Sequence, residues 1–84
     1  MGTVPITTHY NRLMSVDAVV IYGKDTGPYT QAAREAYAAK GPVSYLNVRA
    51  DPMHLARMLQ LSGGKRKVPV IVEQGVVTIG FGGT

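Results

Sequence analysis

The sequence predicts one small α/β domain in which four strands and two helices follow the order βαβαββ. Two segments with helical periodicity, each opened by a proline, alternate with short runs of β-branched residues. Only three residues, Glu-Gln-Gly, separate the last two apolar runs, and such a short link is typical of a hairpin. With 84 residues, the chain can bury a single modest core.

The first half predicts a strand, a tight loop and a helix. Ala18–Tyr22 is a continuous apolar run, as expected for a strand of a parallel sheet that is buried on both faces. The loop spans residues 23–27, and Pro28 suits the first helical turn because its missing N–H is not needed there. The helix is expected to end at Lys40-Gly41-Pro42, with the glycine as its cap. Its expected buried stripe consists of Tyr29, Ala32, Ala33, Ala36 and Tyr37.

The second half predicts a mixed four-stranded sheet. The second strand, Val43–Val48, follows a crossover helix and should therefore run parallel to the first. Asp51 and Pro52 suit the N-cap and first position of a second helix, which a Ser-Gly-Gly sequence ends. The third and fourth strands, Val68–Val72 and Val76–Phe81, should pair as an antiparallel hairpin. The buried stripe of the second helix is expected to be Leu55, Met58, Leu59 and Leu61.

Composition excludes several classes of function. The absence of cysteine excludes a disulfide scaffold, a thiolate metal site and thiol chemistry. His9 and His54 are far apart and lack nearby acidic residues, so no metal is expected, and His54 is expected on the surface of the second helix. The net charge of +4 fits a small anionic ligand better than nucleic acid, because aromatic residues for base stacking are few. Neither a membrane span nor a secretory signal is apparent, so we expect a cytoplasmic protein with no membrane partner.

Three separated motifs give the sequence from Val19 to Thr84 a family resemblance. Residues 22–30, Tyr-Gly-Lys-Asp-Thr-Gly-Pro-Tyr-Thr, are similar to a glutaredoxin active-site loop, in which Cys-Pro-Tyr-Cys or Cys-Pro-Tyr-Ser opens the first helix. Val68-Pro69 is similar to the Val-Pro of that family, whose proline is cis, and Gly82-Gly83 is similar to its glycine pair. The chain therefore resembles a glutaredoxin of the thioredoxin-fold group, with residues 17–84 as the domain and residues 1–16 as an N-terminal extension or tag. It also resembles bacterial glutaredoxin-like proteins that carry selenocysteine or Cys before Pro-Tyr-Thr.

The resemblance implies a glutathione-dependent thiol or selenol oxidoreductase that acts on disulfides of proteins or small molecules, with glutathione as co-substrate and no metal. Gly27 stands at the position of the nucleophile, and Thr30 at that of the resolving cysteine. The backbone of Val68, before a cis proline, would bind the tripeptide like an added strand. The residues expected to contact glutathione are Lys24, Thr26, Tyr29, Arg66, Val68, Pro69, Gly82, Gly83 and Thr84.

Glycine cannot act as a nucleophile, so the chain is expected to be inactive in disulfide exchange. Three explanations of Gly27 remain open. It replaces a native Cys or selenocysteine, which one base change would do; the protein is a natural pseudo-enzyme that retains its groove; or the groove has another use. The alternative function is a non-catalytic module that binds glutathione or a peptide beside Val68-Pro69.

A glutaredoxin adds a helix after the glycine pair, whereas this sequence stops at Thr84. We therefore expect a sheet face that is half uncovered, with an exposed apolar patch. Either residues 1–16 fold back over this face or two chains bury it in a homodimer. Truncation at a further selenocysteine codon just after Thr84 is also compatible with the sequence.

Overall fold

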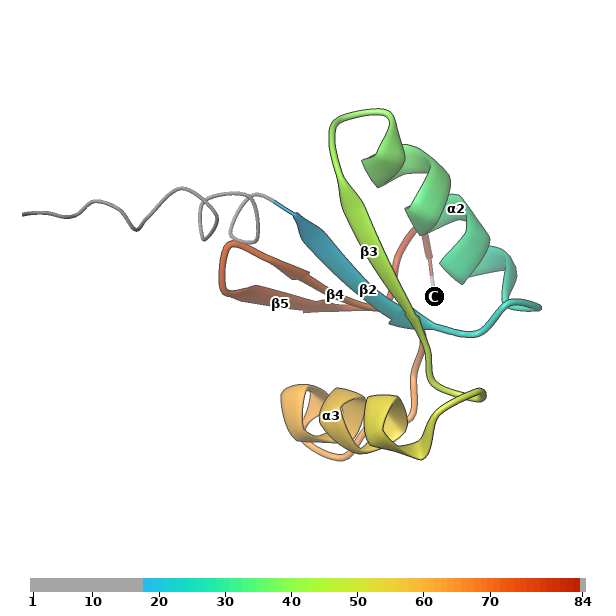
Figure 1. Ribbon diagram of the computed structural model, residues 1–84, viewed down its shortest axis with the longest axis vertical. Helices are drawn as coiled ribbons and strands as arrows, with labels where there is room; N and C mark the ends of the chain where they lie inside the picture. Colours follow the sequence, from blue (N-terminus) through green and yellow to red (C-terminus); the bar gives the residue numbers. More distant parts are fainter. Residues whose placement is uncertain (1–17, 84) are drawn as a thin grey trace, which may run out of the picture.

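The computed structural model describes residues 18–83 and confirms the α/β fold with the order βαβαββ. The predicted extension, residues 1–16, lies outside the described residues. The sheet order is β3-β2-β4-β5, with β2 parallel to β3 and the other neighbouring pairs antiparallel, so the sheet is mixed as predicted (Figure 1). The elements are β2 (Val19–Gly23), α2 (Pro28–Ala38), β3 (Val43–Asn47), α3 (Pro52–Ser62), β4 (Val70–Glu73) and β5 (Val76–Ile79).

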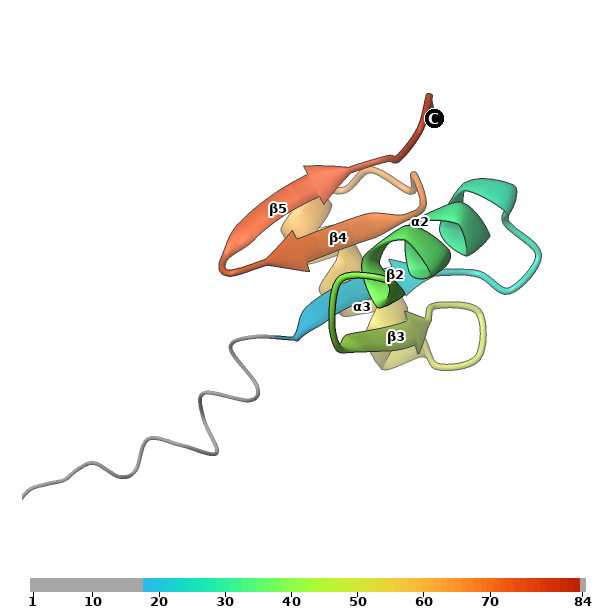
Figure 2. The same cartoon turned by 90° about the horizontal axis from the view of Figure 1, so that it is seen from above.

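The two helices lie on opposite faces of the sheet, which gives three layers (Figures 1 and 2). Helix α2 packs against β2 and β3, whereas α3 contacts all four strands. Strand β2 lies between β3 and β4, and its side chains alternate between the two cores. Ile21 packs in the core below α2, and Tyr22 packs with Met58 in the core below α3. The burial predicted for the first strand is therefore confirmed.

The buried face of α2 differs from the predicted stripe. Tyr29 and Ala32 are exposed, whereas Thr30 and Ala33 are buried against the sheet. The predicted stripe is confirmed at Ala33 and at Tyr37, which packs against the same core. It is wrong at the N-terminal end of the helix, where the hydrophobic pattern favoured Tyr29 over Thr30. Thr30 faces inward because Gly23 of β2 lacks a side chain and leaves room for it.

Several element ends also differ from the prediction. Helix α2 ends at Ala38, and Ala39 caps it in right-handed conformation, so Gly41 is not the cap. Strand β4 begins at Val70, after the cis peptide bond Val68-Pro69, which confirms the predicted cis proline. Strand β5 ends at Ile79, before a glycine with a φ of 93°.

Helix α3 has the predicted ends and the predicted buried face. The Asp51 side chain accepts a hydrogen bond from the N–H of Met53 at 2.9 Å and thereby caps the first turn. Gly63 ends the helix in left-handed conformation, with a φ of 68°, which glycine adopts without steric cost. Met58 is fully buried. The other members of the predicted stripe, Leu55, Leu59 and Leu61, are partly buried around the same core.

The β4–β5 hairpin extends beyond the cover of α2. On the α2 side of the hairpin, Ile71 is buried, while Glu73, Val76 and Thr78 are exposed. Phe81 packs against the adjacent core, so the exposed apolar surface on this face is mainly Val76 and is smaller than expected. No helix follows β5 within residues 18–83. None of the helices in this part of the chain is long and apolar enough to cross a membrane.

Candidate functional site

The N-terminus of α2 has no side-chain cap. Gly27 is the N-cap residue, with Pro28 at the first helical position. The N–H of Gly27 donates to the carbonyl of Lys24 at 3.1 Å and closes the preceding turn. Because the first N–H groups of a helix lack intrahelical partners, this end presents a positive field at position 27.

The backbone at Gly27 does not require glycine. Its φ of −81° and ψ of 121° are ordinary for any residue. A Cβ atom there would lie 3.1 Å from Oγ1 of Thr30 and 3.2 Å from Cγ of Lys24, so it fits once both side chains shift by a few tenths of an ångström. The position can therefore hold a side chain such as that of cysteine.

Thr30 lies directly beside this position, with 1% of its surface exposed. Among the described residues its Oγ1 atom is the one buried side-chain polar atom without a hydrogen-bond partner. A side chain on Gly27 would face this hydroxyl, which is free to donate a hydrogen bond to it. Thr30 was assigned to the resolving position, and the structure adds that its hydroxyl is buried below Gly27.

A cavity of about 290 Å³ opens beside the loop that precedes Gly27. We call it the basic groove. It brings together Lys24, Arg66 and Val68, three of the residues predicted to contact glutathione, and adds Arg49, which sequence reasoning missed. The complete lining is Lys24, Val48, Arg49, Leu55, Met58, Arg66 and Val68, so cations surround an apolar floor.

The positive charge of the basic groove is not neutralised within residues 18–83. Neither Lys24, Arg49 nor Arg66 takes part in an ion pair there. The two carboxylates closest in sequence are used elsewhere, because Asp25 accepts a hydrogen bond from Tyr45 and Asp51 caps α3. The groove is therefore suited to an anionic ligand.

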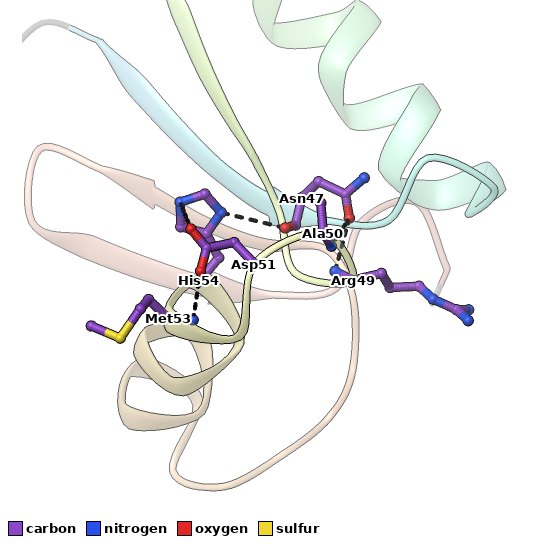
Figure 3. A network of polar contacts seen from close by, with 6 residues as sticks. All are labelled: Asn47, Arg49, Ala50, Asp51, Met53 and His54. Atoms are coloured by element: carbon purple, nitrogen blue, oxygen red, sulfur yellow. Dashed lines mark hydrogen bonds and ion pairs between the residues drawn. The ribbon is translucent and has the colours of Figure 1, made fainter.

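Arg49 is positioned by a network of hydrogen bonds between β3 and α3 (Figure 3). Oδ1 of Asn47 accepts from the N–H of Arg49 at 2.8 Å and from that of Ala50 at 3.2 Å. His54 joins the network, with Nδ1 3.3 Å from the carbonyl oxygen of Asn47 and Nε2 3.6 Å from Oδ2 of Asp51. The Arg49 side chain extends away from these contacts. His54 is partly exposed, with 33% of its side chain accessible, so its predicted place on the surface of α3 is confirmed in part. The prediction that no acidic residue lies near His54 is wrong, because Asp51 is its neighbour on the first turn of the helix.

A buried serine holds the segment that carries Arg66. Oγ of Ser62 donates to the carbonyl of Lys65 at 2.6 Å, and the N–H of Gly64 donates to the carbonyl of Leu59 at 2.8 Å. These bonds fix the turn between α3 and β4, while the side chains of residues 65–67 are exposed. The basic run therefore leaves α3 in a defined direction, with Arg66 at the groove.

The other predicted contacts do not line the basic groove. Thr26 and Tyr29 are exposed outside it, and Pro69 is buried next to Val68. Gly82 and Gly83 are exposed, with φ values of 62° and 109°. Thr84 lies outside the described residues.

A second polar cluster ties the loop before Gly27 to the edge of the sheet. The hydroxyl of Tyr45 on β3 donates to Oδ1 of Asp25 at 2.7 Å, and the guanidinium of Arg34 lies 3.8 Å from the centre of the Tyr45 ring. Burial and the bond to Asp25 raise the pKa of Tyr45 to about 12. The sequence did not predict this cluster, because Tyr45 was interpreted only as an apolar residue of a strand.

No group of acidic and histidine side chains within residues 18–83 could hold a metal ion.

The candidate site consists of two adjoining parts, the uncapped N-terminus of α2 and the basic groove. Lys24 joins them, since it lines the groove and its Cγ would touch a side chain on Gly27.

Comparison with known proteins places the fold. No family model and no curated protein matches the sequence. Among solved structures, the chain is similar to the glutaredoxin of Archaeoglobus fulgidus, with a TM-score of 0.64 and 16% sequence identity. The similarity covers 92% of this chain and 89% of that protein. The chain thus has a thioredoxin-like α/β fold, as predicted.

Proposed function

We propose that this chain is a glutaredoxin-like protein whose basic groove binds glutathione, and that disulfide exchange at this site needs Cys or selenocysteine in place of Gly27. The observation that carries the proposal is the position of Lys24, which belongs both to the groove and to the surroundings of Gly27. A ligand held in the groove therefore lies next to the positive end of α2. The thioredoxin-like fold, similar to that of a glutaredoxin, agrees with this proposal.

The proposed binding mode uses the charges and the floor of the groove. The carboxylates of glutathione pair with Lys24 and Arg66, while the backbone of Val68 bonds to the tripeptide like a neighbouring strand. The apolar floor around Met58 excludes water from these contacts and strengthens them.

With a cysteine at position 27, the reaction would follow the monothiol route. Its thiolate attacks the glutathione sulfur of a mixed disulfide, forms a new disulfide with glutathione and releases the substrate thiolate, which takes a proton from water. The thiolate of a second glutathione then attacks the glutathione sulfur of this intermediate. Oxidised glutathione leaves and the first thiolate is restored, so glutathione supplies both electrons. Thr30 cannot form a disulfide, which rules out the dithiol route.

The test compares the unmodified chain with Gly27→Cys and, as a matched control without a thiol, Gly27→Ser. We expect glutathione-dependent reduction of a glutathione mixed disulfide only for Gly27→Cys. Glutathione should also shift the NMR signals of Lys24, Arg66 and Val68 in the unmodified chain. Absence of both activity and shifts would contradict the proposal that the groove binds glutathione.

The second candidate is a non-catalytic binding module, which the missing nucleophile at Gly27 favours. It predicts glutathione or peptide binding in the groove together with an inactive Gly27→Cys variant.

Two further proposals, on location and on self-association, are compatible with either function. We place the protein in the cytoplasm, where glutathione keeps thiols reduced. We also propose that the hairpin face around Val76 forms a homodimer contact, which a monomer mass in light scattering would contradict.

A further inference from the structure

The basic groove carries more positive charge than glutathione can neutralise. Glutathione has two carboxylates, and its ammonium group adds a positive charge of its own. The groove presents Lys24, Arg49 and Arg66, and no carboxylate within residues 18–83 pairs with any of them. Pairing Lys24 and Arg66 with the two carboxylates of glutathione leaves Arg49 without a partner.

We propose that the groove selects a thiol ligand with three carboxylates, and that Arg49 determines this specificity by binding the third. The inference rests on the proposed function, since it concerns the ligand of the same groove. Arginine suits this role because its planar guanidinium binds a carboxylate through two parallel hydrogen bonds.

The position of Arg49 supports a role in binding rather than in folding. Its backbone N–H donates to Asn47, which holds the point from which the side chain extends away from the network (Figure 3). That side chain makes no ion pair or hydrogen bond within residues 18–83, although it lines the cavity. Arg49 is exposed at the groove, so its guanidinium is accessible to an anion from outside.

The size of the groove restricts the ligand further. A cavity of about 290 Å³ is at the small end of ligand sites, which suits a short peptide. An extended peptide beside Val68 projects successive side chains to opposite sides. An acidic residue next to the cysteine of the ligand can therefore supply the third carboxylate.

The test uses three reduced tripeptides that begin with γ-glutamyl-cysteine and end with glycine, glutamate or glutamine. The glutamate and glutamine peptides differ only in one charge. We expect the unmodified chain to bind the glutamate peptide about tenfold more tightly than the glutamine peptide at low salt, measured by calorimetry. Arg49→Gln should abolish this preference, and Arg49→Lys should restore part of it. Arg57→Gln is the matched control, because Arg57 bonds to Gln60 on α3 and does not line the groove.

The outcomes separate this inference from the proposed function. Equal binding of the glutamate and glutamine peptides would overturn the inference, as would an equal loss of all three peptides in Arg49→Gln. Binding of the glutamate peptide without binding of glutathione would support the inference and contradict the proposed function. Failure of every peptide to bind would overturn both.

Discussion

The hydroxyl oxygen of Thr30 lies 3.1 Å from the place that a Cβ atom on Gly27 would occupy. This hydroxyl is buried without a hydrogen-bond partner, so packing alone holds it there. A donor at this place, beside the N-terminus of α2, stabilises negative charge on a side chain at position 27. Thr30 can therefore act as a hydrogen-bond donor to the side chain at position 27, a role different from that of a resolving cysteine, which forms a disulfide.

The first prediction concerns the thiol of a Gly27→Cys variant. Its pKa should lie below the ordinary value for cysteine, because the helix end, Lys24 and the Thr30 hydroxyl all favour the thiolate. Adding Thr30→Val should raise this pKa, whereas adding Thr30→Ser should leave it nearly unchanged. The absorbance of the thiolate, followed against pH, measures the difference. Identical titrations for the valine and threonine forms would show that the hydroxyl does not act on the thiol.

The second prediction concerns the packing of Gly23 against Thr30. A Cβ atom on Gly23 would lie 2.5 Å from Oγ1 of Thr30, closer than real contacts allow. Gly23→Ala should therefore lower the free energy of unfolding by about 1–3 kcal/mol, measured with urea. Gly41→Ala serves as the control, because nothing lies within 4 Å of its added Cβ. In the double variant with Thr30→Ala most of the loss should be recovered, and purely additive effects would contradict the proposed contact.

Gly23 and Thr30 also show which parts of the structure can be predicted from the sequence and which cannot. The order of elements and the cap at Asp51 follow from local signals that short segments carry. The buried face of α2 does not, because burial of Thr30 depends on the missing side chain of Gly23, a residue on another element. A periodicity argument weighs hydrophobicity along one helix and cannot detect such a fit.

The site shows the same limit. Lys24, Arg66 and Val68 were predicted from motifs, and the fold does bring them into one groove. Arg49 was not, because it belongs to no motif and only the fold brings it to the groove, in a loop whose backbone bonds to the Asn47 side chain. A partial signal was present, since Arg49 follows directly after a predicted parallel strand, at the sheet edge where ligands of α/β proteins bind.

The third prediction concerns Tyr45 and alkaline pH. The pKa of Tyr45 is raised from 10.0 to about 12 in the folded protein, so the unfolded chain loses this proton first. The stabilisation is therefore fully present below pH 10 and is lost as the pH rises towards 12. Tyr45→Phe should remove this part of the decline, measured as the free energy of unfolding in urea across that range. A parallel decline in both proteins would exclude Tyr45 as its source.

The last prediction separates the positioning of Arg49 from the stability of the fold. Asn47→Ala removes the acceptor of the Arg49 N–H, at 2.8 Å, and one of the two acceptors of the Ala50 N–H, at 3.2 Å, and should lower the free energy of unfolding by about 1–2 kcal/mol. Because the backbone N–H of Arg49 then loses its acceptor, Arg49 should be held less firmly and binding of an anionic peptide should also weaken. Asp51→Ala removes the cap of α3 and should cost a similar 0.5–2 kcal/mol, roughly, in stability.

The two variants differ in what else they change, since Asp51→Ala leaves both bonds of Asn47 Oδ1 in place. Peptide affinity should therefore fall in Asn47→Ala and stay near that of the unmodified chain in Asp51→Ala, when both are measured well below their unfolding temperatures. An equal loss of affinity in both variants would mean that the groove responds to general stability. A loss confined to Asn47→Ala would mean that the hydrogen bonds at the end of β3 set the position of Arg49, and through it the charge that faces the ligand.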